Sequence, residues 1–82
     1  MYSKITKLEF VFNEVFDAHP FVKMLMDSAI TDMTMSTSTQ DYTCTVIYEI
    51  DECCIDPQEA IDLDLEHLRA ENITPKSYRI IK

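Results

Sequence analysis

The first predicted element is a β-strand near the N-terminus. In the segment KITKLEFVFN, residues 4–13, the apolar residues Leu8, Phe10 and Phe12 occupy every second position. Successive side chains of a strand point to opposite faces, so this alternation is typical of a strand with one buried face. We therefore predict an extended segment whose even-numbered side chains enter the core.

The next segment predicts an α-helix. Within EVFDAHPFVKMLMDSAI, residues 14–30, apolar residues recur at the helical spacing of three and four positions. Proline is tolerated at the first position of a helix, so Pro20 lies near the expected start, and the pattern leaves open whether the helix begins before or after it. The expected buried stripe consists of Phe21, Val22, Leu25, Met26 and Ala29.

Two segments rich in β-branched and hydroxyl-bearing residues predict a β-hairpin. The first is DMTMSTST, residues 32–39, and the second is YTCTVIYEI, residues 42–50, with a short polar link between them. β-Branched and aromatic residues favour strands. Tyr42, Cys44, Val46, Tyr48 and Ile50 should share one face of the second strand.

A second helix is predicted to begin at DPQE, residues 56–59. Asp56 suits the N-cap and Pro57 the first helical position. Glu59, at the third position, can bond back to the backbone of Asp56. The expected buried stripe of this helix is Ile61, Leu65 and Leu68.

The order of these elements predicts the fold. A last alternating segment, KSYRIIK at residues 76–82, follows the second helix, which we expect to end near Asn72. This order is that of the ferredoxin-like βαββαβ fold, an α+β fold with a four-stranded antiparallel sheet and two helices on one face. We expect residues 1–82 to form a single domain of this kind, with a thin apolar patch of Val11, Ile47 and Ile81 on the open face of the sheet.

The absence of glycine excludes several functional classes. Glycine lets the backbone reach positive φ angles and approach phosphate groups closely. A chain without glycine has no phosphate-binding P-loop, no dinucleotide-binding fingerprint and no nucleophile elbow. With 46% hydrophobic and 27% charged residues, the chain still has the composition of a folded globular protein.

The net charge of -8 argues against direct binding to nucleic acids or membranes. Fifteen acidic residues stand against seven basic ones, and this excess repels phosphate backbones and anionic lipid headgroups. No apolar run approaches the roughly 20 residues of a membrane-spanning helix, and the first residues, MYSKITKLEF, lack the apolar core of a secretory signal. We therefore expect a cytoplasmic protein whose three cysteines are reduced.

The acidic residues are concentrated in the middle of the chain. No lysine or arginine lies between Met24 and Leu68, whereas eleven aspartates and glutamates do. Such a run is either a solubilising face or a docking surface for a basic partner, such as a nucleic-acid-binding protein that accepts carboxylates in place of phosphates. Both interpretations stay open, and a non-enzymatic interaction protein is the preferred hypothesis.

The candidate partner-binding surface follows from the spacing of residues on the second predicted helix. Glu59, Asp62 and Glu66 should form one exposed band, while Asp64 borders the other side of the buried stripe. Leu63 is expected to be exposed as well and is a candidate apolar anchor. The full set of candidate partner-binding residues is Glu49, Asp51, Glu52, Asp56, Glu59, Asp62, Leu63, Asp64 and Glu66.

Neither a metal site nor an active site is expected. Cys53 and Cys54 are adjacent, whereas zinc sites favour two intervening residues that direct both sulfur atoms toward one ion. His67 is expected on the outer surface of the second helix, and His19 near the start of the first. Because catalysis needs a nucleophile, a base and an orienting group together, we expect no catalytic residues, no metal ligands and no cofactor.

In general character the chain resembles the small inhibitors that phages and other mobile elements direct against host defence or transcription machinery. The shared features are short length, lack of glycine, strong acidity and lack of a catalytic constellation. Several such inhibitors are nucleic-acid mimics, and anti-CRISPR proteins belong to this type. The alternative hypothesis is a small regulatory or structural domain that forms a homodimer through the open sheet face or the edge strand DMTMSTST, with acid serving solubility alone.

Overall fold

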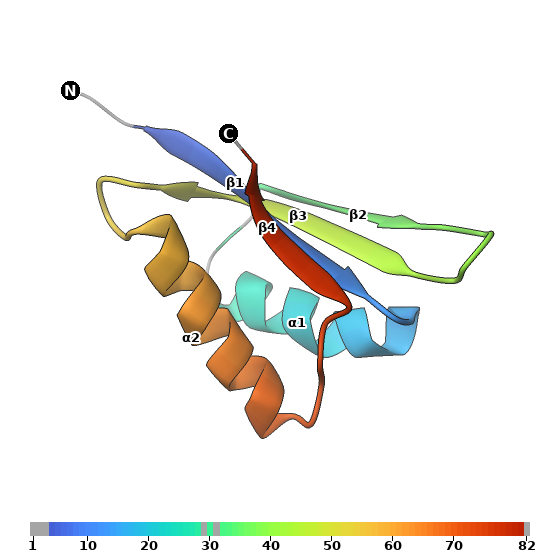
Figure 1. Cartoon of the computed structure of the whole chain (residues 1–82). Helices are drawn as coiled ribbons and strands as arrows, with labels where there is room; N and C mark the ends of the chain where they lie inside the picture. Colours follow the sequence, from blue (N-terminus) through green and yellow to red (C-terminus); the bar gives the residue numbers. More distant parts are fainter. Residues whose placement is uncertain (1–3, 29, 31, 82) are drawn as a thin grey trace.

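Within residues 4–28, 30 and 32–81, which the structure describes, the computed structural model contains six elements in the predicted order. The order strand, helix, strand, strand, helix, strand and the single sheet confirm the ferredoxin-like α+β fold (Figure 1). The elements are β1 (Ile5–Phe12), α1 (Val15–Asp27), β2 (Met33–Thr37), β3 (Cys44–Asp51), α2 (Pro57–Ala70) and β4 (Ser77–Ile81).

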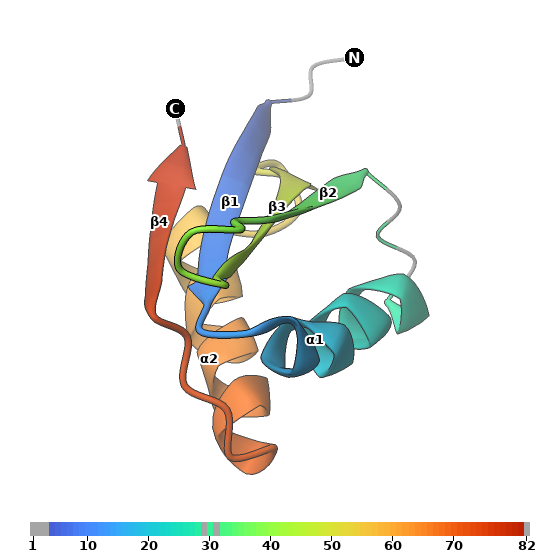
Figure 2. The same ribbon diagram turned by 90° about the vertical axis from the view of Figure 1, so that its right-hand side faces the viewer.

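The strands form one antiparallel sheet in the order β2-β3-β1-β4. β1 and β3 are therefore central, and β2 and β4 form the two edges. Both helices cover the same face of the sheet, the lower one in Figure 1, and leave the other face open. In Figure 2, α2 lies on the side of β4 and α1 on the side of β2. This arrangement separates the outward surface of α2 from the β2 edge.

The core lies between the sheet and the helices and is filled by the even-numbered residues of β1 and β3. Directly opposed residues of antiparallel strands point to the same face, and Phe10 lies opposite Val46 in this register. The ring centroids of Phe10 and Phe21 are 4.8 Å apart, so the aromatic core joins β1 to α1. The largest fully buried side chains are Tyr48, Phe10, Phe12, Phe21, Leu8, Leu25, Val46 and Cys44.

The buried face of α1 differs from the prediction at Met26, which is 64% exposed. Met26 and Met35 of β2 line the same open surface. Because β2 is an edge strand, no further strand of the described sheet lies beside this surface to cover Met26. Ala29, the last residue of the expected stripe, lies outside the described residues. The buried residues of α1 are Ala18, Phe21 and Leu25, and Val22 is partly buried.

A proline lies inside α1, which begins at Val15 and therefore before Pro20. Replacing Pro20 by alanine is expected to raise the free energy of unfolding by about 1–2 kcal/mol. Proline has no N–H for the carbonyl oxygen of Phe16, four residues earlier, and its ring crowds that carbonyl. Alanine at position 20 restores the hydrogen bond to the carbonyl oxygen of Phe16. The unfolded chain of the variant has more conformational freedom than that of the wild type, which offsets part of the gain in stability. Urea unfolding measures the change.

Pro75 offers a matched control because it lies between α2 and β4, outside both helices. Pro75→Ala restores no helical hydrogen bond, so it is expected to bring no stabilisation. The prediction for α1 is contradicted if Pro20→Ala is no more stable than the wild-type protein.

α2 begins at the predicted residue, but Asp56 caps it through the backbone alone. Asp56 is the N-cap residue and Pro57 the first helical residue. The Asp56 carbonyl accepts the N–H of Ala60 at 3.0 Å, whereas the Asp56 carboxylate makes no capping hydrogen bond and remains exposed. Beyond the end of α2, Asn72 adopts a φ of 60°, the left-handed conformation for which glycine is the usual residue.

Candidate functional site

Three acidic residues and one leucine share the outward face of α2. Glu59, Asp62, Leu63 and Glu66 are spaced three or four positions apart, so they line one side of the helix. All four residues are exposed, Leu63 by 44%. These four residues are named the acidic ridge. Asp56 is exposed as well and lies at the N-terminal end of α2.

The acidic ridge has no positively charged partner within 4.0 Å in the part of the chain that the structure describes. Asp62 accepts a hydrogen bond from Gln58 Nε2 at 3.1 Å, which leaves its charge in place. Like charges at this helical spacing destabilise a helix by a few tenths of a kcal/mol per pair. The described ion pairs are Lys4 with Glu52, Lys76 with Asp41, and Arg79 with Glu9.

Asp64 does not belong to this surface, although it was predicted as a candidate partner-binding residue at the border of the buried stripe. The residue is only 8% exposed, and the hydroxyl of Tyr48 on β3 donates a hydrogen bond to Asp64 Oδ2. Ala60, one turn before Asp64, is buried as well. The buried side of α2 consists of Pro57, Ala60, Ile61, Asp64 and Leu68. Asp64 thereby supplies the acceptor that the hydroxyl of Tyr48, itself 2% exposed, needs inside the core.

Burial changes the proton affinity of both members of this pair. Desolvation raises the pKa of Asp64 to about 6, although the hydrogen bond from Tyr48 and the nearby charge of His67 act in the opposite direction. Desolvation and the Asp64 carboxylate together raise the pKa of Tyr48 above its usual value, so the phenol remains protonated. Asp64 therefore lies in the core, bonded to Tyr48, and is not available to a partner.

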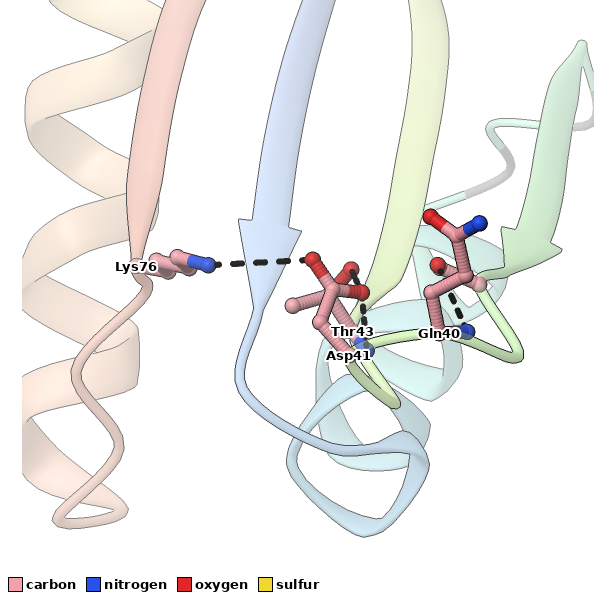
Figure 3. Close-up of polar contacts among 5 residues, drawn as sticks. Gln40, Asp41, Thr43 and Lys76 are labelled. Atoms are coloured by element: carbon pink, nitrogen blue, oxygen red, sulfur yellow. Dashed lines mark hydrogen bonds and ion pairs between the residues drawn. The ribbon is translucent and has the colours of Figure 1, made fainter.

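Two other acids of the central span lie within 4.0 Å of terminal lysines. Glu52 accepts a hydrogen bond from Thr6 Oγ1 and lies 3.6 Å from Lys4 Nζ. Asp41, in the β2–β3 turn, accepts hydrogen bonds from the backbone and hydroxyl of Thr43 and lies 4.0 Å from Lys76 Nζ (Figure 3). The hydroxyl of Thr43 contributes most to lowering the pKa of Asp41. Terminal lysines therefore approach both acids, although no lysine or arginine lies between Met24 and Leu68 in the sequence.

Glu49 and Asp51 belong to β3 and not to the helix that carries the acidic ridge. Glu49 pairs with Lys7 in the β1–β3 register, on the open face of the sheet, which is the face turned away from α2. Asp51 ends β3 and accepts the backbone N–H of Cys53 at 2.9 Å, and this bond lowers its pKa. The structure thus brings together Glu59, Asp62, Leu63 and Glu66 but does not bring Glu49 to the same surface.

No family model, curated protein or solved structure matches this chain. Neither α1 nor α2 has the length and apolar character that crossing a bilayer requires. A functional proposal therefore depends on the shape and charge of the surface alone.

The described residues contain no group of three or more histidine, cysteine, aspartate or glutamate side chains placed to hold a metal ion. Cys44 is buried in the core, whereas Cys53 and Cys54 are exposed in the turn between β3 and α2.

One surface feature escaped the sequence-based prediction. An open hollow of about 890 Å³ runs along α1 and is bordered by Phe16, Val22, Met26 and Met35 among others. Phe16 is 80% exposed. The sequence indicated this exposure only by placing Phe16 outside the expected buried stripe. The contribution of Met35 depends on the distant placement of β2 and has no local sign.

Proposed function

We propose that this chain is a non-enzymatic interaction protein whose acidic ridge binds a basic surface of a larger, nucleic-acid-binding protein. The observation that supports this proposal most directly is the grouping of Glu59, Asp62 and Glu66 on one helical face without a described cation within 4.0 Å. A purely solubilising surface has no need for this concentration, because interleaved lysines would remove the repulsion at no loss of solubility.

The geometry of α2 suits a groove built for phosphate groups. A helix rises 1.5 Å per residue, so the carboxylates of Glu59 and Glu66 start from backbone positions about 10 Å apart on a rigid axis. Carboxylates held at such intervals can accept the hydrogen bonds that arginine and lysine otherwise donate to phosphates. Leu63 lies among them and supplies apolar contact, which strengthens binding beyond electrostatic attraction.

The inhibitory role is part of the same proposal. A protein that fills a basic groove excludes the nucleic acid from it, so the chain would act as a nucleic-acid mimic of the kind that phages and mobile elements use, anti-CRISPR proteins included. The proposed compartment is the cytoplasm, where cysteine thiols stay reduced.

Not every candidate partner-binding residue is expected to contact the partner. Asp56 extends the acidic ridge at the N-terminal end of α2, and Asp64 is removed from the contact surface by burial. Glu52 is partly neutralised by Lys4, and Glu49 faces the other side of the sheet. Glu49, Asp51 and Glu52 therefore add to the negative potential that speeds association rather than to the contact itself.

Reversing the charge of the acidic ridge is expected to weaken partner binding by about tenfold or more. Affinity purification from the native host with mass spectrometry identifies the partner, and calorimetry with the purified partner measures the affinity. The test variant carries Glu59→Lys, Asp62→Lys and Glu66→Lys. Binding of the wild-type protein should also weaken steeply as salt is added, because screening acts on exposed charges.

A matched variant separates the acidic ridge from net charge. Glu14, Asp27 and Asp32 are exposed acids outside α2, and their replacement by lysine changes the net charge by the same amount. This control should retain most of the affinity at physiological salt. Equal weakening by the two triple variants, or binding that is insensitive to salt, contradicts the proposal.

A further inference from the structure

The β2 edge of the sheet carries a regular row of outward backbone groups. The N–H of Glu49 donates to the carbonyl of Asp32 at 3.1 Å, and the N–H of Ser38 donates to the carbonyl of Thr43 at 2.8 Å. Residues of an edge strand alternate between bonding to the neighbouring strand and pointing away from it. Since Asp32 and Ser38 bond toward β3, the backbone groups of the odd-numbered residues Met33, Met35 and Thr37 point outward.

This edge lacks the features that normally prevent strand pairing. Edge strands are usually protected by lysines, prolines, bulges or a covering element. Residues 33–40 contain no charged residue and no proline, whereas the opposite edge, β4, carries Arg79 at its centre and follows Pro75 and Lys76. The two edges therefore differ, and only β2 is open to pairing by this criterion.

An apolar surface continues the β2 edge on the helix side of the sheet. Met35 lies opposite the buried residue Val46 in the register, so its side chain points to the helix side. Met35 is nevertheless 48% exposed and borders the hollow along α1 together with Met26. A molecule that pairs with β2 would cover this apolar surface at the same time.

We propose that a second copy of this chain pairs with the β2 edge in an antiparallel arrangement about a two-fold axis at Met35. In this register Met35 lies opposite Met35 of the second copy, and Met33 lies opposite its Thr37. The outward groups of Met33, Met35 and Thr37 then bond to the same groups of the second copy. The two sheets join into one continuous sheet of eight strands.

The side chains of β2 favour a second copy over a strand of another protein. The register places Thr34 opposite Ser36 of the second copy, where their hydroxyl groups can form hydrogen bonds. It also places Asp32 opposite Ser38, so no charged residue opposes another in a chain with a net charge of -8. α2 lies on the β4 side in Figure 2, so pairing through β2 keeps the two acidic ridges apart. The dimer does not depend on the function of the acidic ridge and would leave both ridges accessible.

Sedimentation velocity and amide hydrogen exchange of the full chain test this dimer together. With rising protein concentration the wild-type protein should shift from monomer to dimer. Exchange at the amides of Met33, Met35 and Thr37 should slow over the same range, while Thr34 and Ser36, already bonded to β3, should change little. A monomer at every concentration, or a dimer in which the three outward amides exchange unchanged, overturns the proposal.

Two substitutions at the proposed two-fold axis make the test specific. Met35→Lys places like charges opposite each other and should raise the dimer dissociation constant at least about tenfold. Tyr78→Lys is the matched control, because Tyr78 is 47% exposed on the same face of the opposite edge strand. It should leave the dissociation constant unchanged, and equal weakening by both variants overturns the proposal.

Met35→Pro distinguishes loss of pairing from loss of the fold. The N–H of Met35 points away from β3, so proline removes a bond of the dimer without removing one within the sheet. This variant should remain folded by circular dichroism and be monomeric. A folded Met35→Pro variant that dimerises as strongly as the wild-type protein overturns the proposed register.

Discussion

Replacing Asp64 by asparagine is expected to raise the free energy of unfolding near neutral pH by about 3 kcal/mol. The carboxyl group is buried between α2 and β3, and desolvation raises its pKa from 3.8 to about 6 in the folded protein. Near neutral pH the folded protein therefore holds an ionised group where a neutral one is favoured. Asparagine is neutral, has nearly the same shape and still accepts the hydrogen bond from Tyr48.

The direction of the pH dependence follows from the two pKa values of Asp64. Between pH 3.8 and about 6 the folded state binds the proton more tightly than the unfolded state does. The stabilisation that protonated Asp64 gives to the folded state is therefore fully present below pH 3.8 and is lost as the pH rises through about 6. Asp41 and Asp51 act in the opposite direction, because their lowered pKa values give a stabilisation that is lost as the pH falls. Maximum stability is accordingly expected in mildly acidic solution.

Urea unfolding at a series of pH values measures both effects. The wild-type protein should lose stability from about pH 4 to pH 7, and Asp64→Asn should flatten this decrease and lie above the wild type at neutral pH. Asp62→Asn, on the exposed side of the same helix, is the control and should leave the shape of the profile unchanged. A stability of Asp64→Asn at or below the wild-type value at neutral pH would show that the carboxylate is not destabilising.

Replacing Tyr48 by phenylalanine is expected to lower the free energy of unfolding near neutral pH by about 3 kcal/mol. The substitution keeps the ring in the core but removes the hydroxyl that donates to Asp64. The ionised carboxylate then stays buried without this donor, which costs more than a neutral hydrogen bond. The pKa of Asp64 should rise further, so the loss of stability with pH should move to higher pH.

A double-mutant cycle shows whether this cost belongs to the pair. In the Asp64→Asn background, Tyr48→Phe removes a hydrogen bond to a neutral group, and the expected cost falls to about 1 kcal/mol. Tyr78→Phe on β4 removes a hydroxyl from an exposed tyrosine and is the control, with no expected change. Equal costs of Tyr48→Phe in the two backgrounds would mean that the two side chains are not coupled.

The buried pair also affects the surface on the other side of α2. The bond between Tyr48 and Asp64 holds one side of the helix against β3. Because residues three or four positions apart share a face, turning Asp64 inward leaves Glu59, Asp62 and Glu66 on the outside. The orientation of α2 that buries the Asp64 carboxylate, at a cost in stability at neutral pH, thus also turns the acidic ridge outward.

The strands and the fold could be predicted because their signals are local. Alternation in β1 and β3 identified the buried residues Phe10, Val46 and Tyr48, and the structure places all three in the core. The start of α2 at Pro57 was equally local, since it depended on four consecutive residues. α1 was less certain, because proline favours a helix start yet Pro20 is tolerated inside the helix.

The candidate site was predicted in part. Glu59, Asp62, Leu63 and Glu66 are exposed together as expected, because helical spacing alone decides which residues share a face. The wider acidic surface was not predictable, because Glu52 is paired with Lys4 and bonded to Thr6, 46 positions away in the chain. No pattern within the segment around Glu52 contains that information.

The sequence by itself determined the order of the elements, the inward face of each central strand and the excess of negative charge. Each of these depends on residues close together in the chain or on composition. The tertiary structure alone decided the rotation of α2 that buries Asp64, the pairing of acids with terminal lysines, and the exposure of Met35 at the β2 edge. Those features depend on contacts between segments far apart in the chain, as between Tyr48 and Asp64, and periodicity within one element cannot specify which neighbour it meets.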